Sequence, residues 1–204
     1  MDSAAWDERY RSSDLIWGDE PNRFVRQLCE RLPIGHALDL GCGEGRNALW
    51  LSRLGWYVTG IDYSPVAVQR AVELTLRQPA SVREQVSWRV ADVTAAPPRA
   101  RSVDLVLISY VHLPPPQRHG LLLGAARALK PDGHVVLVGH DRRNLAEGVG
   151  GPRDADLLYD PAEVAGTLLA EGLVVELAET VQRSSPQGTA IDCLVHARVP
   201  ADVV

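Results

Sequence analysis

A glycine-rich loop and an aspartate farther along the chain are the clearest candidates for binding a ligand. The loop, Asp39-Leu40-Gly41-Cys42-Gly43-Glu44-Gly45, follows a short apolar run and precedes apolar residues at helical spacing. Its glycines permit a tight turn and a close approach of the backbone to a ligand at the helix N-terminus. Asp62 lies 21 residues after Gly41, at the end of the next apolar run, where a carboxylate can accept both hydroxyls of a ribose. The spacing predicts a nucleoside-binding site.

The residues of the loop favour one class of nucleoside over another. A dinucleotide fingerprint, GxGxxG/A, requires a very small residue at its sixth position so that helix and strand pack closely beside a pyrophosphate. That position is Arg46 in this chain. Asp39 and Glu44 flank the turn, and unpaired acids there would oppose a pyrophosphate but suit the ammonium and sulfonium groups of S-adenosylmethionine. The loop therefore favours S-adenosylmethionine, and a nicotinamide-dependent oxidoreductase is the weaker alternative.

The loop and Asp62 belong to a regular alternation of strands and helices. We expect strands at about 37–40, 57–61, 86–91, 103–109, 134–139, 173–181 and 190–199, and helices at about 24–32, 48–54, 64–78, 115–129 and 160–172. A turn is expected at 130–133, and the short connection at 184–188 allows an antiparallel hairpin. The pattern predicts an α/β, doubly wound, Rossmann-like fold with a seven-stranded, mostly parallel sheet and a C-terminal antiparallel hairpin strand.

The length of the chain favours one domain over residues 1–204. Within it we expect an N-terminal helical cap at 1–35, a cofactor-binding half at 36–140, and a substrate loop with the C-terminal strands at 141–204. The glycine-rich stretch at 141–159 interrupts the alternation. Long irregular segments in compact domains are commonly lids or binding loops, and this one leaves the carboxyl end of the fifth strand, where ligands of such folds bind.

Composition excludes several other functions. The net charge is −5, and the basic residues are scattered, which argues against a nucleic-acid partner. Three cysteines without a Cys/His cluster suggest neither a disulfide framework nor a zinc site. No stretch approaches the roughly 20 apolar residues of a membrane span, and the acidic N-terminal stretch is unlike a secretion signal. We expect a cytoplasmic protein acting on a small molecule, and its oligomeric state is left open.

At the same motifs the sequence resembles the class I S-adenosylmethionine-dependent methyltransferases, whose first motif is DxGxGxG. The resemblance covers about residues 38–138 and continues through Ile61-Asp62-Tyr63-Ser64, Val90-Ala91-Asp92-Val93, Asp104-Leu105-Val106 and the turn Lys130-Pro131-Asp132-Gly133. That turn is similar to the KPGG of the family, with Asp132 in place of a glycine. Residues 39–47, DLGCGEGRN, are similar to the DLGCGxGRN of the TehB-like small-molecule methyltransferase branch.

The resemblance implies a cofactor role for each matching residue. Backbone contacts to the methionine part of S-adenosylmethionine would come from Gly41, Cys42 and Gly43, and Asp39 would lie near its ammonium group. Asp62 would hold the ribose, with Tyr63 against the adenine face. Asp92 would bind the adenine amino group, Val93 would offer a backbone N–H to the ring, and Ser109 would offer its carbonyl to the ammonium. Tyr10, or Trp17, would cover the cofactor from the N-terminal helix, unless these aromatic residues belong to the core.

Methyl transfer from a sulfonium is an in-line displacement, so orientation in a dry site can supply much of the rate. A general base is optional. His112 and His140 follow the fourth and fifth strands and are the candidates, because histidine accepts protons near neutral pH. The carboxylate cluster of metal-dependent catechol-type enzymes has no match, since Asp141 stands largely alone after the fifth strand; metal-independent transfer to O, N, S or a chalcogen is expected. The alternative is a binding protein that retains the cofactor pocket without catalysis.

Overall fold

The structure is a computed structural model that describes residues 3–12, 18–95 and 97–201. Trp17, one of the two candidate aromatic residues near the N-terminus, lies outside this part of the chain. The chain divides into two compact units, residues 1–96 and 97–204. Each is described by itself below. The prediction of a single domain over the whole chain stays a prediction.

The first unit contains three parallel strands and five helices among its described residues. In chain order these are α1 (Ser3–Arg11), α2 (Arg23–Cys29), β1 (His36–Leu40), α3 (Arg46–Arg53), β2 (Tyr57–Asp62), α4 (Pro65–Leu76), α5 (Ala80–Arg83) and β3 (Val86–Val90). β2 pairs in parallel with β1 and with β3. Ser64 caps α4 by accepting a hydrogen bond from the Ala67 N–H, and Pro65 takes the first helical position. Leu40, Leu51 and Trp56 are almost fully buried in this unit.

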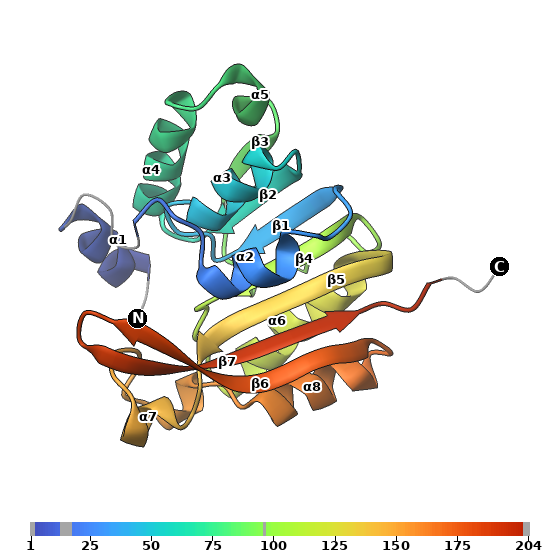
Figure 1. The fold of residues 1–204 in the computed structure, drawn as a ribbon. Helices are drawn as coiled ribbons and strands as arrows, with labels where there is room; N and C mark the ends of the chain where they lie inside the picture. The colour runs from blue at the N-terminus through green and yellow to red at the C-terminus, as the bar shows by residue number, and fades with distance from the viewer. Residues whose placement is uncertain (1–2, 13–17, 96, 202–204) are drawn as a thin grey trace. The chain divides into compact units, whose positions relative to one another are not determined.

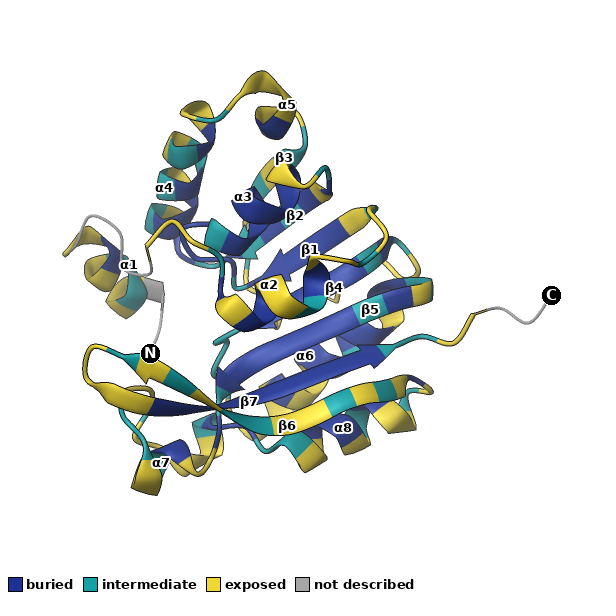
Figure 2. Cartoon of the chain, viewed as in Figure 1, coloured by how far each residue is buried: buried dark blue, intermediate teal, exposed yellow. Residues whose placement is uncertain are grey.

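The second unit contains four strands and three α-helices among its described residues. They are β4 (Val103–Ser109), α6 (Pro115–Ala128), β5 (Leu129–His140), α7 (Asn144–Glu147), the 3₁₀ helix η1 (Ala155–Leu157), α8 (Pro161–Ala170), β6 (Val174–Ser185) and β7 (Gly188–Arg198). β4 and β5 are parallel, whereas β7 pairs antiparallel with both β5 and β6. Figure 2 shows β5 and β7 buried over most of their length, with β6 more exposed at the edge.

The strand order is β3-β2-β1-β4-β5-β7-β6 in one seven-stranded sheet (Figure 1). Parallel pairs in both units and the antiparallel β6–β7 hairpin confirm the predicted fold class. Among the described helices, none combines the length and the apolar character needed to cross a membrane.

Two local expectations from the sequence were wrong, and one short helix was not predicted. The helix expected at 24–32 ends at Cys29, because a residue before a proline, here Leu32, disfavours helical dihedrals. The short helix α5 had no periodicity to reveal it. The turn expected at 130–133 lies inside β5, where Asp132 has φ +60° and the pairing register with β4 shifts between Val103 and Leu105.

The segment at 141–159 is more regular than expected. It contains α7 and η1, and Leu158 and Tyr159 at its end are fully buried. Asn144, 1% exposed, accepts a hydrogen bond from the Ile191 N–H and donates from its amide to the carbonyl groups of Val149 and Gly150. These bonds tie the start of the segment to β7.

Candidate functional site

The glycine loop lies between β1 and α3 in a conformation that needs glycine. Gly41, Gly43 and Gly45 have φ values of +72°, +55° and +84°, in the left-handed region that side chains disfavour. The N–H groups of Gly41 and Cys42 both donate to the Ile61 carbonyl, at 2.8 and 3.0 Å. These two donors are therefore used within the protein.

Asp62 at the end of β2 holds the loop from the side. Its Oδ2 accepts from the Gly43 N–H at 2.8 Å, and its Oδ1 accepts from the Ser64 N–H at 2.9 Å. Burial raises the pKa of Asp62, and the backbone donors of Ser64, Gly43 and Tyr63 partly offset this increase. Each carboxylate oxygen retains a second lone pair, which is what a pair of ribose hydroxyls requires.

Asp39 is the most electrostatically strained group of the loop. Its side chain is completely buried, and neither carboxylate oxygen has a hydrogen-bond partner among the residues that the structure describes. Burial raises its pKa to about 7, and the negative charge of Asp62 adds to the increase. Arg46 and the N–H of Ala48, which lies outside hydrogen-bond geometry, offset only part of it. A cation beside Asp39 would relieve this cost.

Glu44 does not share that property, which corrects the sequence argument. It is 3% exposed, and its Oε1 accepts from the guanidinium of Arg70 on α4 at 2.8 Å. The charge that would attract a cationic ligand is therefore already balanced. Only Asp39 supports the preference for a cationic nucleoside.

Tyr10 lies over the glycine loop. Its ring is 4% exposed, and a Cβ added to Gly43 would meet its hydroxyl oxygen at 2.8 Å. Helix α1 is held in this place because Ser64 Oγ donates a hydrogen bond to Asp7, so the residue that caps α4 also binds α1. The sequence left Tyr10 between a core role and a cofactor contact; the structure shows a buried side chain whose polar end faces the loop.

Trp88 on β3 is a site residue that the sequence analysis missed. A Cβ on Gly45 would lie 2.3 Å from the Trp88 ring, and a Cβ on Gly60 would lie 2.4 Å from it. Gly60 and Trp88 are direct neighbours in the β2–β3 pairing, and the indole N–H donates to Thr75 at 2.9 Å. Trp88 therefore forms one wall against the glycine loop.

The remaining predicted cofactor residues lie at strand ends. Ala91 donates its N–H to the Asp62 carbonyl at 2.9 Å, which brings Asp92 and Val93 to the same edge as Asp62. Asp92 is exposed, and its Oδ1 accepts from the N–H and hydroxyl of Thr94. Tyr63 follows Asp62 directly and is half-buried. Ser109 ends β4 in the second unit. Its predicted contact with the ammonium group stays a prediction.

In the second unit, the two predicted catalytic histidines lie together at the ends of β4 and β5. Their rings stack with centroids 5.4 Å apart. His112 Nδ1 lies 2.8 Å from the Leu157 carbonyl, so Nδ1 carries the hydrogen and Nε2 carries a lone pair. That buried Nε2 has no partner within the described residues. Burial lowers the pKa of His112 to about 4, which makes it a neutral hydrogen-bond acceptor at physiological pH.

A buried carboxylate lies beside His140. Asp192 on β7 is the direct pairing neighbour of His140, and its Oδ1 lies 3.2 Å from His140 Nδ1, without hydrogen-bond geometry. Its Oδ2 accepts from Tyr110 Oη at 2.7 Å and from Arg183 Nε at 2.7 Å. Burial opposes the charge of Asp192, but the nearby His140 and the donors Arg183 and Tyr110 outweigh this effect and hold the pKa of Asp192 below its usual range.

Tyr110 has φ +58°, which is unfavourable for an aromatic residue and is common at functional sites. Its ring meets the His140 ring edge to face, with centroids 5.2 Å apart, and its hydroxyl also accepts from Arg183 Nε at 3.0 Å.

The sequence analysis did not predict Asp192 and Arg183 as site residues. The available signal was Asp192 itself, one charge in the otherwise largely apolar run 190–197.

Comparison with known proteins identifies a related domain family and related sequences. Residues 37–133 match the family model described as a methyltransferase domain. Methyltransferase GfsG of Streptomyces halstedii is 32% identical over 121 residues, which cover 56% of this chain and 42% of that protein. The chain spans half or less of the length of the curated relatives that it matches first.

Two solved structures have the same fold. The N-methyltransferase NodS of Bradyrhizobium japonicum WM9, in complex with S-adenosylhomocysteine, superposes with a TM-score of 0.72 at 22% identity, covering 98% of this chain and 100% of that one. TehB of Haemophilus influenzae gives a TM-score of 0.72 at 17% identity, covering 97% and 66%. The chain therefore has the fold of these methyltransferases, and its residues 37–133 match a methyltransferase domain.

Proposed function

We propose that the protein transfers a methyl group from S-adenosylmethionine to a small-molecule acceptor, without a metal in the chemical step. The observation that carries the proposal is Asp39, a fully buried carboxylate without a hydrogen-bond partner among the described residues, beside a glycine loop and Asp62. A pyrophosphate would be repelled by the Asp39 carboxylate, whereas a cationic nucleoside would neutralise it. The methyltransferase domain match supports the same conclusion.

The residues of the first unit fit S-adenosylmethionine by their chemistry. Asp39 would pair with its ammonium group, and the second lone pairs of Asp62 would accept the ribose hydroxyls. Asp92 and Val93, beside Asp62, would meet the adenine, and Tyr10 would exclude water above Gly43. When bound, S-adenosylmethionine supplies a methyl group that its sulfonium has already activated.

The second unit supplies groups that suit an acceptor with a proton on O, N or S. His140 Nε2 would accept the proton that the acceptor loses, and the negative charge of Asp192 near Nδ1 would stabilise the imidazolium that forms. His112 Nε2, which stays neutral, would accept a hydrogen bond and orient the acceptor. Orientation accounts for most of the rate in this proposal, because the donor is already activated.

Ligand binding separates this proposal from its alternatives. Calorimetric titrations with S-adenosylmethionine, S-adenosylhomocysteine and NADH should show binding of the first two only. Binding of NADH alone would refute the assignment of S-adenosylmethionine as the cofactor.

Turnover tests the acceptor. A screen of phenols, thiols, amines, tellurite and RNA, read by release of S-adenosylhomocysteine, should find turnover with a small molecule. Tight cofactor binding without turnover on any of them favours the non-catalytic binding protein, and turnover on RNA alone overturns the small-molecule acceptor.

Single variants then test the two histidines. His112→Ala and His140→Ala should lower kcat while cofactor affinity stays within about two-fold, with at least one loss below the 100-fold typical of an obligate base. His119→Ala, an exposed position on α6, is the matched control and should leave kcat unchanged. A collapse of activity in both variants that high pH restores would contradict a mechanism dominated by orientation.

A further inference from the structure

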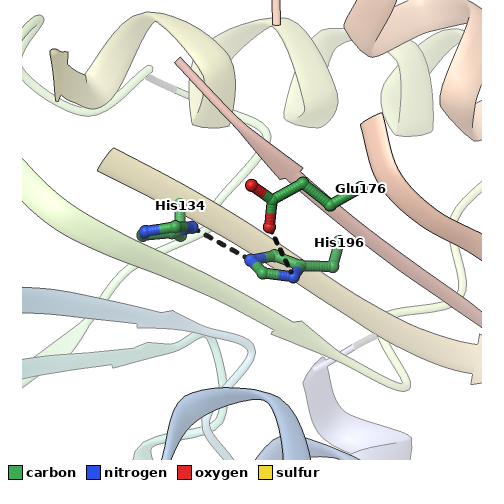
Figure 3. A group of neighbouring side chains, drawn as sticks. All are labelled: His134, Glu176 and His196. Carbon is green, nitrogen blue, oxygen red and sulfur yellow. Dashed lines mark hydrogen bonds and ion pairs between the residues drawn. The ribbon is translucent and has the colours of Figure 1, made fainter. Parts of the chain in front are cut away.

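Two histidines and a glutamate on three neighbouring strands form a cluster that the methyl-transfer proposal does not use. His134 lies on β5, His196 on β7 and Glu176 on β6 (Figure 3). His134 Nδ1 lies 3.0 Å from His196 Nε2, and His196 Nδ1 lies 3.3 Å from Glu176 Oε2. One ligand atom from each of the three residues lies within 4.8 Å of the others. We call this group the His134–Glu176–His196 cluster.

The pairing of the strands brings the three side chains together. In the β5–β7 register, Val136 pairs with His196 and His134 pairs with Arg198, so His134 and His196 project from the same face. The β6–β7 register shifts between Val175 and Leu177, which makes Glu176 the extra residue of a bulge. Bulges commonly redirect a side chain, and this one leaves Glu176 beside His196.

The cluster is separate from the candidate catalytic histidines. His134 precedes His140 by six residues on the same strand, which corresponds to about 20 Å at the rise of an extended strand. A ligand bound to the cluster would therefore act on the sheet and not on the acceptor.

We propose that the His134–Glu176–His196 cluster binds one divalent transition-metal ion, with Zn²⁺ as the reference ion. Two imidazole nitrogens and one carboxylate oxygen are the donor set of zinc sites that keep a further position for water. With metal–ligand bonds of about 2.0–2.1 Å, ligand atoms in a tetrahedral site lie about 3.4 Å apart. The 3.0 and 3.3 Å distances involve different nitrogens of His196, so its ring must turn to present one nitrogen to the ion, starting from ligand atoms that lie within 4.8 Å of one another.

The charges around the cluster leave one glutamate oxygen for the ion. Arg198 Nε lies 3.2 Å from Glu176 Oε1, so the guanidinium orients the carboxylate while Oε2 faces His196. Arg198 would repel a cation, but Asp132 Oδ1 pairs with its Nη1 at 2.7 Å. Two carboxylates against one guanidinium give the surroundings a net negative charge, which favours a cation.

A bound ion would cross-link the three strands β5, β6 and β7 through their side chains. β6 is the last strand of the sheet order, and metal bonds would join it to β7 and β5 in addition to the backbone ladder. Because the three ligands meet only in the folded chain, metal binding would stabilise the fold.

The test uses the full-length chain without an affinity tag, freed of metal by a chelator and dialysed at pH 7.5. Calorimetric titration with zinc sulfate should give one ion per chain, and Co²⁺ should give the visible ligand-field bands of a tetrahedral site. Zinc at about 100 times its dissociation constant should raise Tm by about 5–10 °C. His134→Gln, at a half-exposed position, should weaken zinc binding at least 10-fold and remove the Tm shift.

Matched variants distinguish the cluster from other zinc ligands. His119→Ala keeps all three cysteines and the cluster, and should bind zinc like the wild type. Glu176→Gln should weaken binding, and His196→Ala should abolish it; circular dichroism of the metal-free proteins checks that both variants fold. Absence of zinc binding by the wild type would overturn the proposal. Zinc binding that persists in the His134→Gln, Glu176→Gln double variant would also overturn it, by placing the ion elsewhere.

Discussion

Replacing Asp39 by asparagine removes the buried negative charge of the glycine loop while keeping the shape of the side chain. Asp39 is completely buried, and burial together with Asp62 raises its pKa to about 7 from an ordinary value of 3.8. The folded state therefore holds the proton more tightly than the unfolded state. The stabilisation from this proton is complete below pH 3.8 and is lost as the pH rises through about 7.

The size of this effect follows from the two pKa values. Between pH 8 and pH 5.5, proton binding with a folded pKa of about 7 and an unfolded pKa of 3.8 adds about 2 kcal/mol to the unfolding free energy. We expect the wild-type protein to gain this amount on acidification, in addition to the contributions of its other groups. Asp39→Asn should lack it, so the difference between the two proteins should change by about 2 kcal/mol across that pH range.

Urea unfolding followed by tryptophan fluorescence measures this difference where it arises, because all five tryptophans precede residue 97. His112 also contributes to the pH dependence, because burial lowers its pKa in the folded state to about 4 from the ordinary value of 6.5, but this contribution is common to both proteins and cancels. Asp19→Asn, which changes an exposed carboxylate in the same unit, is the matched control. It should retain the wild-type pH dependence.

Cofactor binding provides the second half of the experiment. A bound ammonium group should return the Asp39 pKa toward its ordinary range, so saturating S-adenosylmethionine should reduce the pH dependence of wild-type stability. Asp39→Asn should weaken S-adenosylmethionine binding about 10- to 150-fold, the loss expected for one charge-assisted hydrogen bond. Equal pH dependence in the variant and the wild type would refute the argument that Asp39 is an uncompensated buried charge.

Three further substitutions test the geometry of the two sites. Asp62→Ala should lower S-adenosylmethionine affinity by about 1.5–3 kcal/mol in a folded protein; unchanged affinity by calorimetry would contradict the ribose assignment. Gly43→Ala should cost about 1–2 kcal/mol in urea unfolding because φ is +55° and the new Cβ meets Tyr10, and wild-type stability would exclude that contact. Asp192→Asn should lower kcat about 10- to 100-fold with the cofactor Kd unchanged, since it removes the charge beside His140; an unchanged kcat would leave Asp192 a purely structural role.

Local signals in the sequence predicted most of the elements. The pairs Ser64-Pro65 and Asp160-Pro161 begin α4 and α8 as expected, because a capping side chain followed by proline favours a helix start in any context. The glycine loop and Asp62 were predicted to meet, and the Gly43 N–H donates to Asp62. Such features depend on a few neighbouring residues and on the known geometry of one strand-to-helix unit.

Features that depend on strand register were not predictable in the same way. Asp192 reaches His140 only because β7 pairs antiparallel with β5 in one register, and a shift by one residue would turn it to the other face. The pairing of Glu44 with Arg70 likewise depends on where α4 packs. The sequence supplied the identities of these residues, and tertiary packing decided their partners.

The contact of Trp88 with Gly45 and Gly60 also constrains how this protein can change during evolution. Gly45 is fixed by its positive φ as well as by the indole, but Gly60 has no such backbone requirement, and the indole and Cys42 Sγ are what its Cβ would meet. A lineage that keeps tryptophan at position 88 must keep glycine at position 60, whereas a smaller residue at 88 relieves the closest contact there. The requirement for glycine at position 60 therefore comes from the size of the Trp88 side chain on the neighbouring strand and does not depend on any ligand.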